Sequence, residues 1–362
     1  MQLDKTLTVA SSPHIKTEDG TRSIMLDVII ALCFPLVMAI YFFGWRSLTL
    51  TLISVCSCIA FEWLYRYFTK KSVTIGDLSA VVTGMLLAMN LPASTPMWIP
   101  VVGAFFAIVI VKQLYGGLGK NFMNPALAAR AFLFSWPGLI SLWTKPLSGS
   151  LPLFGNVTRA DIPDMVATAT PLAKMKQGIL PSVASGEMGA DAIYSLRDTF
   201  LGNVPGCLGE VSAIVLIAAF VYLLVRKVIT AHVPLSYIGT VAVITFLFPR
   251  GGASGLEWML FNLFTGGLML GAIFMATDYA TSPVSKSGKI IFGIGCGLIT
   301  VLIRYFGSYA EGVSYSILIM NTCVWFIDKH CMPRRFGTER FAKLSGILAK
   351  FKNKSAKEAE SK

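Results

Sequence analysis

Residues 24–43, with the sequence IMLDVIIALCFPLVMAIYFF, decide the fold class of this chain. A helix rises about 1.5 Å per residue, so a run of this length crosses a hydrocarbon core about 30 Å thick. Asp27 is its only charged residue. The whole chain has the same character, since its 362 residues are 54% hydrophobic and 14% charged, with a mean hydropathy of +0.66. This composition leaves too few polar residues for the surface of a soluble domain.

Further apolar segments accompany residues 24–43 along the chain. They are residues 48–64, 78–91, 98–111, 126–143, 211–225, 235–248, 256–276, 290–306 and 313–327. The segment 78–91 is short and runs into Asn90-Leu91-Pro92. We predict an all-α polytopic membrane protein with about ten transmembrane helices.

The basic residues predict which side of the membrane each loop faces, because Lys and Arg are enriched in cytoplasmic loops. Alternate loops collect them: Lys16 and Arg22, Arg66, Lys70 and Lys71, Lys112 and Lys120, Arg226 and Lys227, and Lys286 and Lys289. The first twenty or so residues are polar and lack the apolar core of a cleavable signal peptide. We expect a multi-pass protein of the bacterial inner membrane with both termini in the cytoplasm.

These spans and loops divide the chain into five regions. They are a cytoplasmic amino-terminal segment (1–23), a first five-helix membrane half (24–143), an extracytoplasmic loop (144–205), a second five-helix membrane half (206–328) and a basic cytoplasmic tail (329–362). The net charge of +12 follows from this topology, because the basic residues flank helices rather than forming an aromatic-interleaved surface. We therefore expect the lipid membrane, and no nucleic acid, as a partner.

A weak internal repeat indicates how the two halves are related. Residues 83–89 (TGMLLAM) in the third predicted span resemble residues 265–271 (TGGLMLG) in the eighth. An offset of five spans reverses the direction of the second half, which gives inverted halves with functional sites at broken helices. The alternative is a chance recurrence of Thr-Gly followed by aliphatic residues in a glycine-rich membrane protein.

Several chemistries are disfavoured because the sequence lacks their motifs. Five of the seven cysteines lie in predicted spans and no Cys-x-x-Cys pair occurs, so we expect no metal or iron–sulfur site made by this chain alone. The histidines, His14, His232 and His330, are not spaced as metal ligands. No Ser-His-Asp set, Walker A sequence or zincin motif points to a hydrolase or an ATPase.

Motifs spread along almost the whole chain carry a resemblance to a known family. They are Ser12-Pro13-His14, residues 116–125 (GGLGKNFMNP) leading to Arg130, residues 164–172 (DMVATATPL), residues 205–212 (PGCLGEVS), and Ala276-Thr277-Asp278 followed by Thr281-Ser282-Pro283. The chain resembles the RnfD/NqrB family, the membrane subunits of the Rnf ferredoxin:NAD oxidoreductase and of the sodium-pumping NADH:quinone oxidoreductase. Its first span begins close to the amino terminus, which favours the RnfD branch.

The resemblance implies a covalent flavin in the loop 144–205. In the family, a threonine of a Ser/Thr-Gly-Ala-Thr motif is joined through a phosphoester to FMN. The matching residues are Ala167-Thr168-Ala169-Thr170, where the Ser-Gly half is replaced. Thr170 is the implied attachment residue because it precedes Pro171 as the family threonine does, and Thr168 is the alternative acceptor. Asp164 belongs to the implied recognition sequence or is an ordinary turn carboxylate.

Other polar residues are candidates for flavin contact. Gly206 and Gly209 precede a span, where backbone N–H groups hold a phosphate or a flavin edge, or where a loop simply begins a helix. Asn121 and Asn124 are three residues apart, so their amides converge on one face. Members that resemble NqrB hold a noncovalent riboflavin near such residues, and the alternative here is a Gly-Asn-Pro turn. Arg130, inside the fifth predicted span, needs a carboxylate, phosphate or flavin carbonyl as its partner.

Three carboxylates lie at predicted cytoplasmic ends of spans, namely Asp77, Asp278 and Asp328. Acidic residues in spans need a partner or a function. The resemblance associates positions that match Asp77 and Asp328 with cation uptake, and hard oxygen ligands suit Na⁺ or H⁺. The alternative is a helix-end carboxylate that contacts water or an adjacent lysine.

The resemblance therefore implies an oxidoreductase subunit that is not catalytically complete alone. It would carry covalent FMN in an Rnf complex that moves Na⁺ or H⁺, with a second FMN-bearing subunit and iron–sulfur membrane subunits as partners. Two alternatives stay open. One is NqrB, the corresponding membrane subunit of the Na⁺-translocating NADH:quinone oxidoreductase, and the other is a carrier of a small neutral solute, which an inverted repeat also suits.

Overall fold

The structure is a computed structural model that describes residues 20–140, 143–144, 146, 152–154, 170–176, 196–210, 212–250 and 254–331. Every regular element in these residues is helical. Thr168, Asp164, the tail beyond residue 331 and most of the loop 144–205 lie outside the described residues. The prediction of an all-α protein is confirmed for the part that is described.

The first half of the chain forms six α-helices, a 3₁₀ turn and a π-helical segment in the described residues. They are α1 (Thr21–Phe43), α2 (Arg46–Phe68), the 3₁₀ turn η1 (Ile75–Asp77), α3 (Ser79–Met89), α4 (Trp98–Phe105), its π-helical continuation η2 (Phe106–Gln113), α5 (Pro125–Leu133) and α6 (Pro137–Ile140). Apolar composition, rather than a polar and an apolar face, characterises α1 and α3, as expected for helices surrounded by lipid and protein.

The second half begins with short helices and ends with two long ones. They are α7 (Pro171–Lys176), α8 (Leu196–Leu201), η3 (Leu208–Glu210), α9 (Ala213–Val225), α10 (His232–Leu247), α11 (Gly255–Phe264), α12 (Leu268–Leu270), the π-helical η4 (Gly271–Met275), α13 (Lys286–Phe306) and α14 (Val313–His330). Ser285 and Ser254 cap α13 and α11 with their hydroxyls, which accept from backbone N–H groups of the first turn.

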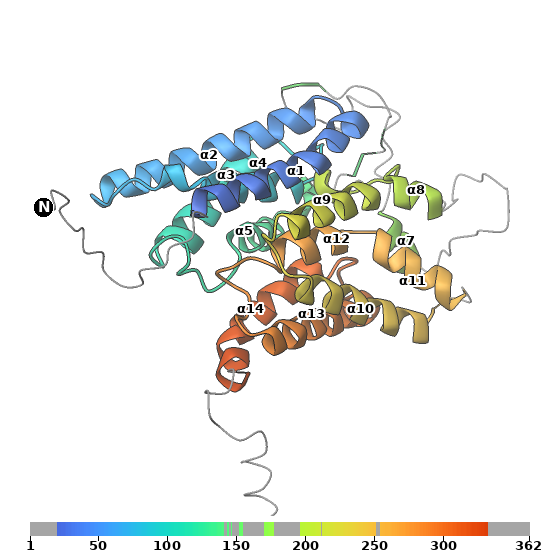
Figure 1. Cartoon of the computed structure of the whole chain (residues 1–362). Helices are drawn as coiled ribbons and strands as arrows, with labels where there is room; N and C mark the ends of the chain where they lie inside the picture. Colours follow the sequence, from blue (N-terminus) through green and yellow to red (C-terminus); the bar gives the residue numbers. More distant parts are fainter. Residues whose placement is uncertain are drawn as a thin grey trace, which may run out of the picture.

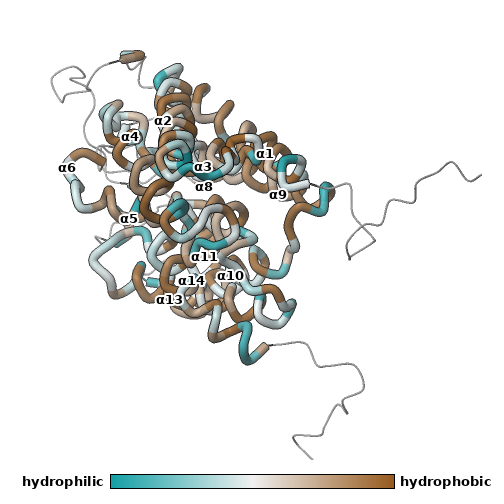
Figure 2. Tube along the Cα trace, turned by 90° about the vertical axis from the view of Figure 1, so that its left-hand side faces the viewer, coloured by the Kyte–Doolittle hydropathy of each residue, from teal (hydrophilic) through white to brown (hydrophobic). Residues whose placement is uncertain are grey.

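The helices gather in two groups that meet in the middle of the molecule. In Figure 1, α1 and α2 run together along one side, and α10 and α13 lie together on the other. Contacts of α9 with α1 and of α5 with α14 join the two groups. Large apolar side chains such as Val225, Leu247 and Phe306 are exposed, and apolar residues predominate along the helices in Figure 2. An outward apolar surface of this kind is expected where lipid, not water, surrounds the protein.

The helix lengths support a multi-pass membrane protein. Three helices, α1, α2 and α13, are long and apolar enough to cross a membrane, and α11 with α12 and η4 form a fourth candidate that bends by 64°. Most of the other predicted segments correspond to shorter apolar helices. The count of about ten spans and the two inverted halves stay predictions.

Two predicted spans differ from the structure. The segment 126–143 is not one helix, because α5 ends at Leu133 and α6 begins only at Pro137. Pro137 has no N–H to continue the ladder, and Ser135 and Trp136 form turns with backbone carbonyls of the preceding helix. The segment 256–276 is interrupted between Phe264 and Leu268.

Buried arginines stabilise the places where helices break. At the interruption after α11, Gly266 has φ +73°, and Arg304 from α13 donates to the carbonyl of Asn262 at 2.6 Å and to that of Thr265 at 3.5 Å. After α3, Arg46 donates to the carbonyls of Ala93 and Thr95 at 2.8 and 3.0 Å. Each guanidinium satisfies carbonyls that no helix uses, which membrane interiors require.

Candidate functional site

A buried arginine lies where the two helix groups meet. The Asn124 side chain caps α5 by accepting from Ala126 N at 3.0 Å, and Pro125 occupies the first helical position. This start places Arg130 in the core with 3% of its surface exposed. Its Nη1 donates to Asn90 Oδ1 at 2.8 Å.

Two carboxylates neutralise this guanidinium from different segments. Arg130 Nη2 lies 2.8 Å from Glu311 Oε2 and 3.6 Å from Glu210 Oε1, and it also donates to Cys207 Sγ at 3.6 Å. The sequence predicts a carboxylate, a phosphate or a flavin carbonyl as the partner of Arg130, and the structure places two carboxylates of this chain beside it. We name Asn90, Arg130, Glu210 and Glu311 the central cluster.

The central cluster keeps unused hydrogen-bonding capacity. Arg130 Nε, Glu210 Oε1 and Glu311 Oε1 have no hydrogen-bond partner among the described residues. Buried polar atoms are usually satisfied, and an exception is explained by strain, by a functional role or by a bound water or ion. One cation facing two carboxylates also leaves room for a further positive charge or a proton.

Thr170 begins α7 at the edge of this cluster. It is 7% exposed, and its Oγ1 accepts from Ala173 N at 3.3 Å. A cavity of about 10 Å³, the space of one water, adjoins it. The lining of this cavity includes Thr170, Pro171, Leu172, Gly206, Glu210, Gly266 and Glu311. The structure therefore brings together Thr170, Pro171 and Gly206, and places them beside the carboxylates that hold Arg130.

Gly209 has a different role from Gly206. A Cβ on Gly209 would lie 2.8 Å from Met89 Cβ and 2.7 Å from Leu270 Cδ2. The residue is therefore needed for close packing of η3 against α3 and α12, and it does not line the cavity at Thr170.

A second cavity, of about 190 Å³, lies on the other side of Leu172. It is enclosed by α7, α11 and α13, and its lining includes Lys176, Arg250, Trp258, Asn262, Arg304 and Tyr305. None of these residues was a predicted site residue. The chain brings them from segments that are far apart in sequence, so the sequence offered no local signal.

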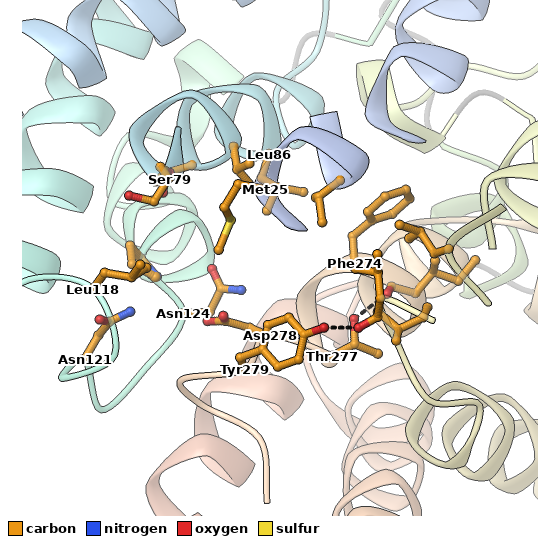
Figure 3. Close-up of a pocket in the computed structure, with 18 of the residues that line it drawn as sticks. Met25, Ser79, Leu86, Leu118, Asn121, Asn124, Phe274, Thr277, Asp278 and Tyr279 are labelled. Atoms are coloured by element: carbon orange, nitrogen blue, oxygen red, sulfur yellow. Dashed lines mark hydrogen bonds between the residues drawn. The ribbon is translucent and has the colours of Figure 1, made fainter. Parts of the chain in front are cut away.

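The third site is a cavity near the start of α3 and α5 (Figure 3). It has a volume of about 80 Å³ and shares Met25, Leu118, Asp278 and Tyr279 with a neighbouring cavity of about 410 Å³. Asn121 and Asn124 both line the smaller one, as their spacing predicts.

The two amides are used differently. Asn121 Oδ1 is buried without a hydrogen-bond partner in the described structure. Asn124 caps α5 and donates from Nδ2 to the carbonyl of Met275 at 3.2 Å, so it joins α5 to the end of η4. Asn121 is thus the amide that is free to bind a ligand, while Asn124 fixes the wall of the cavity.

Only one of the three predicted cation-path aspartates lines this cavity. Asp278 does, and its carboxylate accepts from Ala280 N at 3.4 Å and from Thr281 Oγ1 at 3.2 Å. Burial in the loop raises the pKa of Asp278 above its ordinary value. Asp77 lies in η1 and is not among the residues that line the cavity, and Asp328 Oδ1 accepts from Val284 N at 3.1 Å.

A buried ion pair at the same cavity went unrecognised in the sequence. Lys112 Nζ lies 2.9 Å from Glu62 Oε2 and donates to Ser79 Oγ at 2.7 Å, and Gln113 donates to Glu62 as well. The pattern of basic residues predicts Lys112 in a cytoplasmic loop. It lies inside η2 instead, with 2% of its surface exposed, because the π-helical turns extend the helix beyond the apolar run.

The described residues contain no group of three or more His, Cys, Asp or Glu that could hold a metal ion. All seven cysteines are free thiols, and Cys207 is the one that contacts the central cluster.

These features define a class of protein: a polytopic helical membrane protein with broken helices, a buried charge cluster at its centre and cavities toward opposite ends. The chain belongs to the NQR2, RnfD, RnfE family, whose match covers residues 8–337. The predicted family membership is confirmed.

Curated relatives align over nearly the whole chain. The chain is 46% identical over 340 residues to the D subunit of the Na⁺-translocating ferredoxin:NAD⁺ oxidoreductase complex of Acetobacterium woodii, with 93% of this chain and 97% of the relative covered. It is 38% identical to the D subunit of the proton-translocating ferredoxin:NAD⁺ oxidoreductase complex of Clostridium ljungdahlii, with 92% and 97% covered. It is 37% identical to the D subunit of the ion-translocating oxidoreductase complex of Stutzerimonas stutzeri, with 87% and 91% covered.

Proposed function

We propose that this chain is the D-type membrane subunit of an ion-translocating ferredoxin:NAD⁺ oxidoreductase, and that it relays electrons through FMN joined to Thr170 by a phosphoester. The observation that carries the proposal is the position of Thr170: its hydroxyl adjoins the central cluster, with Gly206 and Pro171 at the same cavity. Relatives of known assembly that align over more than nine-tenths of this chain support it.

The residues around Thr170 fit a phosphoester-linked flavin only if the flavin extends from Thr170 past Leu172, away from Glu210 and Glu311. The cavity at Thr170 has room for about one water, and Glu210 and Glu311 there oppose an anionic phosphate. The neighbouring cavity beyond Leu172 is larger and has cationic walls. When bound, the flavin supplies a ring that accepts and releases electrons, while the protein fixes its position and its surroundings.

The chain's own residues would keep this region rigid and dry. Arg130 holds the two carboxylates of the central cluster, and Asn90 orients the guanidinium from the end of α3. Thr170 Oγ1 is oriented by Ala173 N. These contacts fix the hydroxyl relative to the centre of the protein, so an attached group could adopt only a few positions.

A second, noncovalent flavin is proposed for the cavity of Figure 3. Asn121 Oδ1 is the unpartnered acceptor there, suited to a ring N–H, and the neighbouring cavity of about 410 Å³ provides space. Riboflavin, which lacks the phosphate, suits a lining with the carboxylate of Asp278 and few free cations. The second FMN-bearing subunit and the iron–sulfur membrane subunits would then exchange electrons with these two flavins.

Intact mass separates this proposal from a carrier of a neutral solute. We expect the purified chain to exceed its sequence mass by one FMN less water. The denatured protein band should also fluoresce yellow under ultraviolet light. An unmodified chain would favour the carrier.

Orientation in the membrane can be tested with two engineered cysteines, in a chain whose exposed native cysteines are replaced by alanine. Leu201→Cys lies at the α7 and α8 end, which we propose faces outward, and Val284→Cys lies at the opposite end. An impermeant thiol reagent should label the Leu201 position in intact cells and the Val284 position only after lysis. Labelling of Val284→Cys in intact cells would invert the proposed orientation.

The cation path is tested by neutralising aspartates one at a time. Asp278→Asn keeps the size of the side chain but removes the charge that offsets cation dehydration. In the assembled complex, we expect about tenfold more Na⁺ to be needed for half-maximal electron transfer, which corresponds to about 1.4 kcal/mol of lost binding free energy. If protons are coupled, activity should instead be lost at a lower pH.

Asp77→Asn and Asp328→Asn test the path that the family resemblance implies. Asp328→Asn can also be compared with Asp278→Asn. Asp328 accepts from Val284 N at a helix end, whereas Asp278 lines the cavity. Unchanged cation dependence in all three variants, with flavin content intact, would assign the ion path to another subunit.

A further inference from the structure

The cavity of about 190 Å³ beside α7 is lined by three cations. Lys176 comes from the last turn of α7, Arg250 follows α10, and Arg304 belongs to the last turn of α13. No carboxylate is among the described residues that line the cavity. A cavity with this charge is built for an anionic or electron-rich group.

The cations are held in place without being neutralised. Lys176 Nζ donates to the carbonyls of Gly307 and Tyr309, and Arg250 Nη1 donates to that of Tyr305 at 2.7 Å. Arg304 is 6% exposed, and its Nε has no hydrogen-bond partner in the described residues. None of the three lies within ion-pair distance of a described carboxylate.

Two carboxylates act on the cavity from a distance. Glu311 and Glu210 influence Arg304 electrostatically, but they lie 2.8 and 3.6 Å from Arg130, which offsets one of their two charges, so the three cations of the cavity outnumber the charge that remains. The cavity therefore keeps a net positive potential.

The remaining walls are flat or apolar. Trp258 Nε1 donates to the hydroxyl of Tyr305 at 2.8 Å, and the two rings are tilted by 58°. Leu172 and Met175 come from α7, on the same helix as Lys176. Asn262 adds an amide next to Arg304, with Oδ1 at 3.4 Å from Nη1. Aromatic and aliphatic walls with a cationic, hydrogen-bonding edge are complementary to a planar ring that carries carbonyls and nitrogens along one side.

The cavity lies within reach of Thr170. Leu172 lines both this cavity and the one at Thr170. From Thr170 to Lys176 the chain rises about 9 Å, at about 1.5 Å per residue. A phosphoribityl linker is a chain of single bonds of about 1.5 Å each and covers a similar distance.

We propose that the isoalloxazine ring of the flavin on Thr170 occupies this cavity, with Trp258 and Tyr305 in its aromatic wall and Arg304 and Lys176 at its polar edge. This inference rests on the proposed attachment to Thr170. It directs the ring away from Glu210 and Glu311 and toward the cations. Electrons that enter the ring add negative charge, which Arg304 and Lys176 stabilise, so these residues raise the reduction potential of the flavin.

Fluorescence of the folded protein tests the position of the ring. Trp and Tyr side chains in contact with a flavin quench its emission by electron transfer. We expect the folded wild type to emit weakly, and Trp258→Phe combined with Tyr305→Phe to increase that emission several-fold. Trp325→Phe is the matched control, because Trp325 is 73% exposed on α14 at the opposite end of the molecule, and it should leave the emission unchanged.

A potentiometric titration tests the cations. Arg304→Gln should lower the flavin midpoint potential. Arg304→Gln also loses the contacts with the end of α11 and could fail to fold. In that case Arg250→Gln and Lys176→Gln are used instead, because these two residues are exposed, and each should lower the potential in the same way. Lys289→Gln, a cation of the opposite end, should have no effect.

The outcomes separate failure of this inference from failure of the attachment. No flavin in the denatured wild-type band would refute the attachment, and with it this inference. Flavin in the denatured band, with unchanged folded emission in the aromatic variants and an unchanged potential in the cation variants, would refute the ring position alone. Phospholipid released from the folded protein by Arg250→Gln and Lys176→Gln, with flavin emission unchanged, would likewise refute it and assign the cavity to a lipid phosphate.

Discussion

Replacing Thr170 with valine is expected to remove the covalent flavin completely while the chain still inserts. Valine has nearly the shape of threonine, so it preserves packing at a residue that is 7% exposed. It loses the hydroxyl and the hydrogen bond from Ala173 N, a helix-cap contact that contributes about 1 kcal/mol. The measurement is ultraviolet fluorescence of the denatured band together with intact mass.

Thr168→Val is the matched control for this experiment. Thr168 is the other threonine of the motif, and it lies outside the described residues. Its replacement should leave the flavin in place. If Thr168→Val removes the fluorescence and Thr170→Val does not, the alignment of this chain with the family motif is shifted by two residues.

The helices that surround the site could be predicted because membrane insertion depends on local composition. Residues 24–43 and 290–306 correspond to α1 and α13 with only small differences at the ends. Apolar composition does not show where a helix is interrupted. The sequence therefore predicts residues 126–143 as one span, although a new helix begins at Pro137. The break at Gly266 was likewise hidden within an apolar run, although the proposed repeat directed attention to that sequence.

Single residues of the candidate site could be predicted from the sequence, but most of the contacts between them could not. Arg130 was recognised because a guanidinium in a span needs a partner, but Glu311 is 181 residues away and Asn90 is 40 away. Sequence spacing carries no information on such contacts. The signal that could have indicated Glu311 is its position as a lone acid between the segments 290–306 and 313–327. Asn121 and Asn124 were predicted to converge because they are close in sequence, and they line one cavity.

Removing the charge of Arg130 is expected to produce the largest loss of stability in this chain. Arg130→Gln leaves Glu210 and Glu311 facing each other in the core without their cation. Removing one partner of a buried ion pair costs about 3 to 5 kcal/mol, because the remaining charge is uncompensated. We expect a much lower thermal unfolding temperature in detergent, with flavin lost as the protein unfolds.

Arg226→Gln is the matched control. Arg226 is paired with Asp27 at 3.1 Å, but its side chain is 56% exposed, and ion pairs of that kind contribute about 0 to 1 kcal/mol. Its replacement should barely change the unfolding temperature. The comparison isolates burial as the cause of the difference.

A second substitution shows whether the lost charge is the cause of the Arg130 effect. Glu311→Gln combined with Arg130→Gln removes the carboxylate that lies 2.8 Å from the guanidinium, and glutamine can still hydrogen-bond to its neighbours. The double variant should recover part of the stability that Arg130→Gln loses, since only Glu210 then remains charged. If Arg130→Gln is as stable as the wild type, or if the double variant is no more stable than Arg130→Gln, the charge of Arg130 does not stabilise the core. The central cluster would then not be the electrostatic anchor that holds α3, α5 and η3 around Thr170.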